Sequence, residues 1–218
     1  LEDRTEQIMA AGFDGMFLVA AKPVGIMTSA VARSSGLPPH RILGSGTVTD
    51  TVWLRHLLGH YFLVDPRSIH AYVLGEPEGG GLIPWSLAQI AAKPLLRICD
   101  EHPDRFRYED LIALGEEVRD TPRRLSETGK APAGCGDAAA LARIASALLR
   151  DEQSVLPVTS LLEGEYGQNG VWTATPCVLG RGGVESKLCL PLTASESERL
   201  AEHCDQLRDH CLRLWKTL

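Results

Sequence analysis

The chain has 218 residues, with 22 Lys or Arg, 28 Asp or Glu and a formal net charge of −6. This acidic balance argues against a nucleic-acid-binding face. The sequence has no apolar run long enough to span a membrane and does not open with a signal peptide, so we expect a cytoplasmic protein of one large or two small domains. The six cysteines form no C-x-x-C pair, which favours reduced, structural thiols.

The first part of the chain predicts a strand, a helix and a second strand. Leu1–Ala11 has the pattern of an amphipathic helix that ends at Gly12, and because the pattern starts inside a helix we expect further sequence upstream. Gly15–Ala21 is a continuous apolar run, as in a buried parallel strand. Ile26–Ser34 is predicted as a helix and Arg41–Gly44 as a short strand. This order indicates part of a doubly wound α/β sheet.

The middle of the chain is built around the stretch Ser68–Ser86. Its first half, to Leu74, alternates and is rich in β-formers, which predicts a strand that runs into a glycine-rich loop. Ser86 is placed to cap a following helix through Ile90. A helix over Thr49–Phe62 is predicted to precede this stretch.

The last part of the chain predicts helices followed by an antiparallel sheet. The expected elements are a loop or short helix over Ile98–Arg107, long helices over Tyr108–Ser126 and Ala138–Leu149, strands over Val155–Val158, Leu161–Tyr166, Thr175–Leu179 and Gly183–Leu188, and a terminal helix over Thr193–Leu214. Ser195 and Glu198 have the spacing of a capping box for that last helix. This part is therefore expected to be α+β.

Several segments resemble one known family, the L-lactate/malate dehydrogenases of the bacterial L-lactate dehydrogenase type. Gly12–Val24 is similar to the family's G-F-D-G-I-F-L-V-A-T-N-P-V, and Arg41–Thr51 to R-V-I-G-S-G-T-x-L-D-T. Ser68–Ser86 resembles H-A-Y-x-x-G-E-H-G-D-S-x-x-P-x-W-S, and Leu141–Arg181 is also similar. The resemblance implies a remnant of a Rossmann sheet over residues 1–46, followed by a C-terminal catalytic and oligomerisation domain over residues 47–218.

The resemblance also implies NAD as cofactor, although the family's nucleotide-binding part has no counterpart in this sequence. That part carries a strand, a G-x-G-x-x-G turn and an acidic residue for the ribose. Gly134–Ala139 fits G-x-G-x-x-A, but Ala131–Ala133 precedes it in place of an apolar strand. We therefore interpret Gly134–Ala139 as the start of a helix.

Most of the family's catalytic residues are replaced. The resemblance places the family's active-site Asp at Asp50, its substrate-carboxylate Arg at Trp53 and its catalytic His at Pro77. The Asn of N-P-V-D falls on Lys22 and the Asp of that motif on Gly25. The substrate-side Thr of K-G-A-T falls on Pro132 or Ala133. Indole cannot imitate a bidentate guanidinium, and proline has no titratable group.

Two other sets of residues near these positions are candidates. Glu76, Glu78 and Lys22 could form a replacement acid/base set, or the two glutamates could simply be solvated. Trp53 could line an apolar pocket with Trp85 or pack in the core.

Histidines and an arginine suggest two further sites. Arg55 and His70 match positions that, in bacterial lactate dehydrogenases, bind fructose 1,6-bisphosphate at a subunit interface, although both could serve the framework only. His56 and His60 are spaced for a metal on one helix face, but no third ligand has suitable spacing, so no metal is expected.

Two readings of function follow. One is a divergent NAD-dependent oxidoreductase that reduces pyruvate or oxaloacetate poorly. The other is a catalytically silent scaffold, oligomerisation module or metabolite sensor. Under both readings we expect a homo-oligomer, because the apolar strands near the N-terminus and the apolar helix Ala138–Leu149 need cover.

Overall fold

The computed structural model describes residues 1–77, 81–128 and 134–216 as a mixed α/β structure. The helices of this described part are α1 Glu2–Ala10, α2 Val24–Ser35, α3 Val48–Phe62, α4 Leu95–Glu101, α5 Tyr108–Thr128, α6 Cys135–Leu149 and α7 Ala194–Lys216. Its strands are β1 Phe17–Val19, β2 Ile42–Gly44, β3 Ile69–His70, β4 Gln89–Ile90, β5 Lys93–Pro94, β6 Ser154–Glu163, β7 Asn169–Gly180 and β8 Gly183–Lys187. No helix of the described residues is long and apolar enough to cross a membrane.

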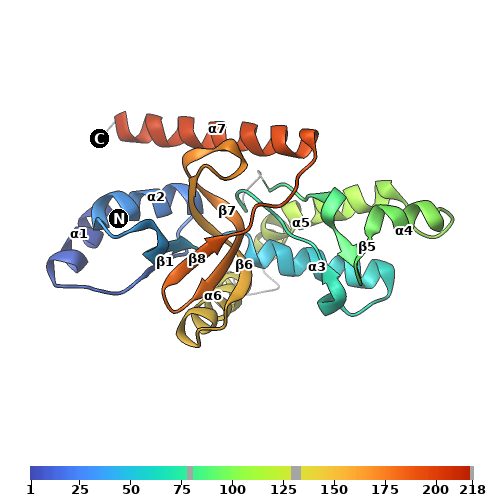
Figure 1. Ribbon diagram of the computed structural model, residues 1–218, viewed down its shortest axis with the longest axis horizontal. Helices are drawn as coiled ribbons and strands as arrows, with labels where there is room; N and C mark the ends of the chain where they lie inside the picture. Colours follow the sequence, from blue (N-terminus) through green and yellow to red (C-terminus); the bar gives the residue numbers. More distant parts are fainter. Residues whose placement is uncertain (78–80, 129–133, 217–218) are drawn as a thin grey trace.

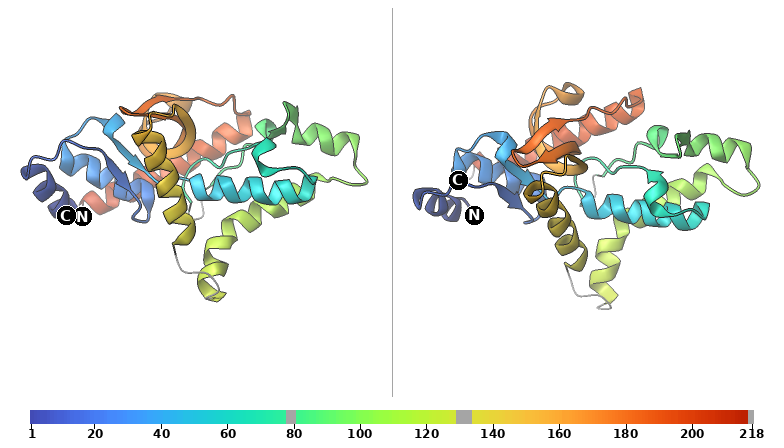
Figure 2. Two further views of the ribbon diagram at one scale, coloured as in Figure 1. Left: turned by 90° about the horizontal axis from the view of Figure 1, so that it is seen from below. Right: turned by 60° about the horizontal axis from the view of Figure 1, so that its bottom comes forward.

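The main sheet has five strands in the order β1-β2-β6-β7-β8. β1 and β2 are parallel and are joined by α2, so the predicted strand–helix–strand order is confirmed. The remaining strands are antiparallel, and β2 joins β6 at the pair Gly44 and Thr159. Figure 1 shows α7 on one side of the β6–β7 hairpin and α6 on the other, and the two views of Figure 2 agree.

The prediction of separate strands over Val155–Val158 and Leu161–Tyr166 is wrong, because β6 runs without a break from Ser154 to Glu163 and ends before the 3-10 turn Glu165–Gly167. Thr159 and Ser160, the two residues between the predicted strands, are buried inside β6. Thr159 pairs with β2 on one side and with Ala174 of β7 on the other, so the neighbouring strands hold the backbone extended. Polar β-formers can therefore occupy the middle of this sheet.

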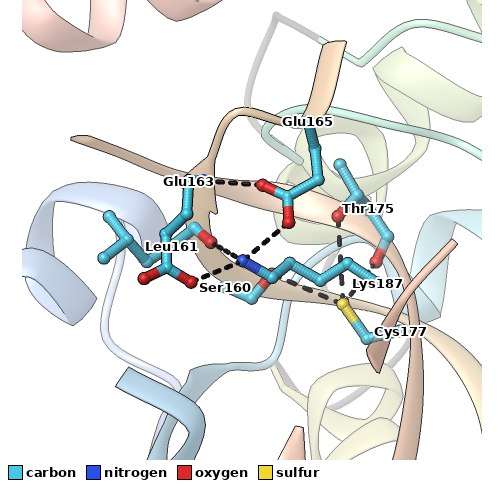
Figure 3. A network of polar contacts seen from close by, with 7 residues as sticks. All are labelled: Ser160, Leu161, Glu163, Glu165, Thr175, Cys177 and Lys187. Atoms are coloured by element: carbon cyan, nitrogen blue, oxygen red, sulfur yellow. Dashed lines mark hydrogen bonds and ion pairs between the residues drawn. The ribbon is translucent and has the colours of Figure 1, made fainter. Parts of the chain in front are cut away.

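A polar network ties the last three strands together around Lys187 (Figure 3). The ammonium of Lys187 donates to the Leu161 carbonyl at 2.6 Å and to the Glu163 carboxylate at 2.9 Å, and it lies 3.0 Å from Glu165 Oε1. Beside it, the buried Cys177 thiol donates to the Thr175 carbonyl. Burial raises the pKa of this thiol, so Cys177 stays protonated and structural. The network fixes β8 against β6.

The strand predicted over Ser68–Leu74 is much shorter than expected. Only Ile69 and His70 form β3, although Leu74 bridges Leu82 and Gly75 bridges Ala174 further on. The backbone between these points is bonded to side chains of α3 and the turn before it instead of to a strand. The Thr47 hydroxyl donates to the Val73 carbonyl, and the Val73 N–H donates to the Thr51 hydroxyl at 3.0 Å.

The helix predicted after Ser86 is wrong. A single 3-10 turn, Trp85–Leu87, is followed by the hairpin of β4 and β5, which reverses at Ala91 and Ala92 in left-handed conformations. Ser86 does not cap a helix of its own. Its N–H and hydroxyl donate to the Glu196 carboxylate at the start of α7. Ser86 is therefore bonded to a residue 110 positions further along the chain, and not to the backbone of a helix that follows it.

The terminal helix α7 is confirmed, but its predicted capping pair is not. The capping box is formed by Thr193 and Glu196, not by Ser195 and Glu198. Thr193 N–H donates to Glu196 Oε2 at 2.9 Å, and Glu196 N–H donates to the Thr193 hydroxyl at 3.3 Å. The helix begins two residues earlier than that pair implied.

Helix α6 is buried on one face only, although its sequence is apolar nearly all round. Ile144, Ala147 and Leu148 pack against the main sheet. Ala142 is exposed, and Leu149 is 79% exposed. The apolar composition of this helix thus leaves an uncovered face in the single chain.

Candidate functional site

Three charged residues from distant parts of the chain meet near the carboxyl ends of β1 and β2. Lys22 follows β1, Asp50 lies in the first turn of α3, and Asp137 lies in the first turn of α6. The Lys22 ammonium is 3.7 Å from Asp137 Oδ2, and both charges act on Asp50. The structure therefore brings together two of the predicted positions, Lys22 and Asp50, and adds Asp137, which the sequence analysis did not single out.

Asp50 is the most perturbed carboxyl of this group. The residue is 7% exposed, and its Oδ2 accepts no hydrogen bond from the described part of the chain. Burial raises the pKa of Asp50 to about 7, opposed by the charge of Lys22 and reinforced by that of Asp137. A carboxyl with this pKa is half protonated at neutral pH, so it can hold or release a proton there.

Trp53, at the predicted carboxylate-anchor position, is part of a packed surface. Its ring stacks on His56 with centroids 5.0 Å apart, and it packs against the cluster that contains Trp85. Of the two readings of Trp53 and Trp85, the core-packing one describes these contacts. Trp53 presents no cation to a substrate carboxylate.

Glu76, one of the proposed replacement acids, is buried against the start of α2. Its Oε2 accepts a hydrogen bond from the Gly25 N–H at 3.1 Å. A Cβ at Gly25 would lie 2.6 Å from Glu76 Oε1 and 2.5 Å from the Trp172 carbonyl. The space that a side chain at position 25 would need is thus filled. A carboxylate at a helix N-terminus is a stabilising arrangement in its own right.

Of the four other predicted residues in this region, the structure describes one, Pro77. Pro77 is half-buried in the turn after Glu76 and offers no proton-transfer group. Glu78, Pro132 and Ala133 lie outside the described residues.

Arg55 contacts the backbone next to His70. Arg55 Nε donates to the carbonyl of Ala71, the residue after His70, at 3.0 Å. Its guanidinium lies over the Tyr72 ring, 5.0 Å from the centroid, and His70 is exposed. Arg55 therefore has a framework role, and its guanidinium also lies near an exposed histidine.

His56 and His60 contact each other edge to face, with ring centroids 4.5 Å apart. Among the described residues, no group of three or more His, Cys, Asp or Glu is placed to hold a metal ion.

The glycine turns of the described chain do not fit a dinucleotide. The turn between β2 and α3 contains Gly44 and Gly46, but a Cβ at Gly46 would lie 2.4 Å from the Pro157 carbonyl of β6. These glycines allow close packing of the chain on itself. Gly134 caps α6 in a left-handed conformation, and that pattern is a helix start as predicted. We therefore derive no chemistry through a nucleotide bound to these turns.

This fold defines a mixed α/β protein with the C-terminal domain of a dehydrogenase. Residues 47–214 match the family described as lactate/malate dehydrogenase, alpha/beta C-terminal domain. The chain belongs to the lactate/malate dehydrogenase family.

Individual relatives agree with this assignment. The chain is 39% identical to an L-lactate dehydrogenase of Oceanobacillus iheyensis over 92% of its length and 62% of the relative's. It is 40% identical to L-lactate dehydrogenase 1 of Peribacillus psychrosaccharolyticus over 94% and 64% of the two lengths. The chain thus spans less than two thirds of the length of these relatives.

Solved structures show the same fold. The ligand-free crystal structure of the minor L-lactate dehydrogenase of Enterococcus mundtii matches with a TM-score of 0.91 and 33% identity, over 96% of this chain and 67% of that one. The lactate dehydrogenase MGS-M5, from a Medee basin deep-sea metagenome library, matches with a TM-score of 0.91 and 34% identity, over 95% of this chain and 66% of that one.

Proposed function

We propose that this protein is a divergent member of the lactate/malate dehydrogenase lineage that does not reduce pyruvate or oxaloacetate efficiently. One observation carries the proposal: the position of the substrate-binding cation is occupied by Trp53, whose ring is stacked on His56 and packed against the core. A bound 2-oxo acid would present its carboxylate to an indole instead of a guanidinium.

The proton chemistry of the family is also weakened. Reduction of a carbonyl requires an acid that delivers a proton to the oxygen, and Pro77 cannot supply one. Asp50 remains, but Lys22, which faces it, also pairs with Asp137. Glu76 is bonded to the start of α2. These contacts favour a structural role for the groups proposed as a replacement acid/base set.

The resemblance implies NAD as the cofactor. We propose that the glycine turns described here do not bind it, so any use of NAD depends on another, nucleotide-binding part of the family fold. The packing of β6 against Gly46 supports this restriction.

A second function, as a silent oligomerisation module or metabolite sensor, is favoured by two surface features. The exposed face of α6 offers an apolar contact, and Arg55 beside His70 offers a cationic one. An anion site here would raise the melting temperature in the presence of millimolar fructose 1,6-bisphosphate. An equal melting temperature with and without this anion, in the wild type and in Arg55→Ala, would leave both residues as framework only.

Substrate binding tests the main proposal separately from turnover. The protein is titrated with NADH by fluorescence and then with pyruvate by calorimetry. We expect no heat from millimolar pyruvate in the wild type, and measurable binding in Trp53→Arg. Tight pyruvate binding by the wild type would contradict the proposal, whereas failure to bind NADH alone would favour the silent reading.

A further inference from the structure

A cleft of about 430 Å³ lies between α2, α7 and the β6–β7 hairpin. Figure 1 shows α7 lying across α2 and β7. The apolar surface of the cleft includes Leu161 and Trp172 from the hairpin and Leu207 from α7. This size is within the range of pockets that hold small molecules, and it is too small for a folded partner.

The charged residues of the cleft are both cations. Among the described residues that line it, only Arg33 of α2 and Arg208 of α7 carry a charge, although the whole chain has a net charge of −6. The two arginines come from two different helices that line the cleft, Arg33 from α2 and Arg208 from α7. A cleft with apolar walls and cationic groups from two sides is complementary to an anion that carries an apolar tail.

The arginines are held by their neighbours without being enclosed. Arg208 Nη2 donates to Gln168 Oε1 at 3.1 Å, and Arg208 also pairs with the exposed Asp205. These contacts use two of the five N–H donors of its guanidinium. Arg33 is 54% exposed and lies 3.9 Å from Glu2 Oε1. Both side chains are therefore positioned at the edge of the cleft, where a carboxylate can reach them.

We propose that this cleft binds a small amphipathic carboxylate. The apolar tail contacts Leu161, Trp172 and Leu207, and burial of that tail supplies the non-directional part of the affinity. The carboxylate accepts hydrogen bonds from Arg33 and Arg208, which supply the charge selectivity. This binding uses neither Asp50 nor Trp53, so it does not depend on whether the protein reduces 2-oxo acids.

A thiol in the cleft reports on occupancy. Cys211 lines the cleft, with its sulfur 3.7 Å from the Ser29 hydroxyl. Cys135 and Cys189 are exposed elsewhere and serve as references within the same molecule. The experiment measures the rate at which iodoacetamide alkylates each cysteine, by mass spectrometry, with octanoate as the probe and with octanol and acetate as matched controls.

Octanoate is expected to slow alkylation of Cys211 several-fold and to leave Cys135 and Cys189 unchanged, while octanol and acetate at the same concentration leave all three unchanged. Arg33→Ala and Arg208→Ala should each reduce this protection, and Arg208→Lys, which keeps the charge, should retain most of it. Arg150→Ala removes an exposed arginine at the C-terminal end of α6, outside the cleft lining, and should have no effect. Equal protection by octanol, or no protection by octanoate in the folded wild type, would overturn the proposal.

Discussion

Asp50 gives the protein a pH dependence opposite in sign to that of a salt-bridged carboxylate. Burial raises its pKa from 3.8 to about 7, so between these values the folded state keeps a proton that the unfolded chain has lost. Stability therefore falls as pH rises through this window, by up to about 4 kcal/mol. Asp50→Asn should raise the free energy of unfolding at about pH 8 and change it little at about pH 4, as measured by urea denaturation.

Two neighbours of Asp50 serve as opposed controls. Removing the positive charge with Lys22→Met should raise the pKa of Asp50 further, and Asp137→Asn should lower it, because these charges act on Asp50 with opposite signs. The midpoint of the stability change should move accordingly. If Asp50→Asn changed stability equally at both pH values, the pKa of Asp50 would be the same in the folded and unfolded states, and this account of its pKa would be wrong.

Gly25 cannot carry a side chain in this structure. An added Cβ would lie 2.5 Å from the Trp172 carbonyl, which is backbone and cannot move aside cheaply. Gly25→Ala should lower the free energy of unfolding by about 2 kcal/mol or more, despite the better helix propensity of alanine. Gly182→Ala is the matched control, since its nearest contact would be 3.9 Å away, and it should change stability by less than about 0.5 kcal/mol.

At the level of single residues, the resemblance identified Asp50, Lys22, Trp53 and Pro77 as active-site positions. It did not predict which residues these side chains contact in the fold. Asp137 was visible only as part of a glycine pattern, and its pairing with Lys22 joins residues about half the chain length apart. Local patterns carry no information about such a contact. The only available hint was an acidic residue in the first turn of a predicted helix.

At the level of elements, Glu196 holds the start of α7 to the loop that contains Ser86. Its carboxylate accepts from the Ser86 hydroxyl at 2.6 Å and from the Thr193 N–H at 2.9 Å. Burial opposes ionisation of Glu196, but these hydrogen bonds prevail and lower its pKa. The stabilisation is present at neutral pH and is lost as pH falls through the lowered pKa.

Glu196→Gln should therefore cost about 1 kcal/mol at neutral pH, because a half-buried carboxylate that accepts charge-assisted bonds is replaced by a neutral amide. Thermal unfolding measures the effect. Glu198→Gln changes an exposed residue on the same helix, two positions on, and should change stability by less than about 0.5 kcal/mol. A larger loss in Glu198→Gln than in Glu196→Gln would contradict the observed capping box.

Helices were easier to predict than the segments between them. The predicted helices Thr49–Phe62 and Tyr108–Ser126 correspond closely to α3 and α5, because each repeats its apolar positions over several turns. The segments around Ser68 and Ser86 were wrong in detail. There, hydroxyls from Thr47, Thr51 and Ser86 bond distant partners, and these bonds override the local β and helix preferences.

At the level of the whole molecule, we predict a homo-oligomer that covers the exposed face of α6. Placing a charge there with Ala142→Glu should lower the oligomer mass measured by light scattering at micromolar concentration, because a buried unpaired carboxylate is costly. Ser197→Glu adds the same charge to an exposed position of α7 and should leave the mass unchanged. A monomeric wild type would refute the prediction.

The architecture followed from the sequence only as far as the order of its elements. The parallel pair β1 and β2 was predicted from an apolar run and a strand–helix–strand pattern. The pairing of Gly44 with Thr159, which joins this pair to the antiparallel strands in one sheet, was not. That pairing connects residues 115 positions apart, and it also places β6 against Gly46.

We propose that this protein keeps the fold of its family but does not reduce 2-oxo acids efficiently. The most direct test is the steady-state turnover of pyruvate with saturating NADH. The L-lactate dehydrogenase of Oceanobacillus iheyensis serves as the positive control. Because loss of one proton-transfer group costs about 10²–10⁴-fold, the account predicts turnover at least that far below the control. A turnover near the enzymatic median of about 10 per second would contradict it.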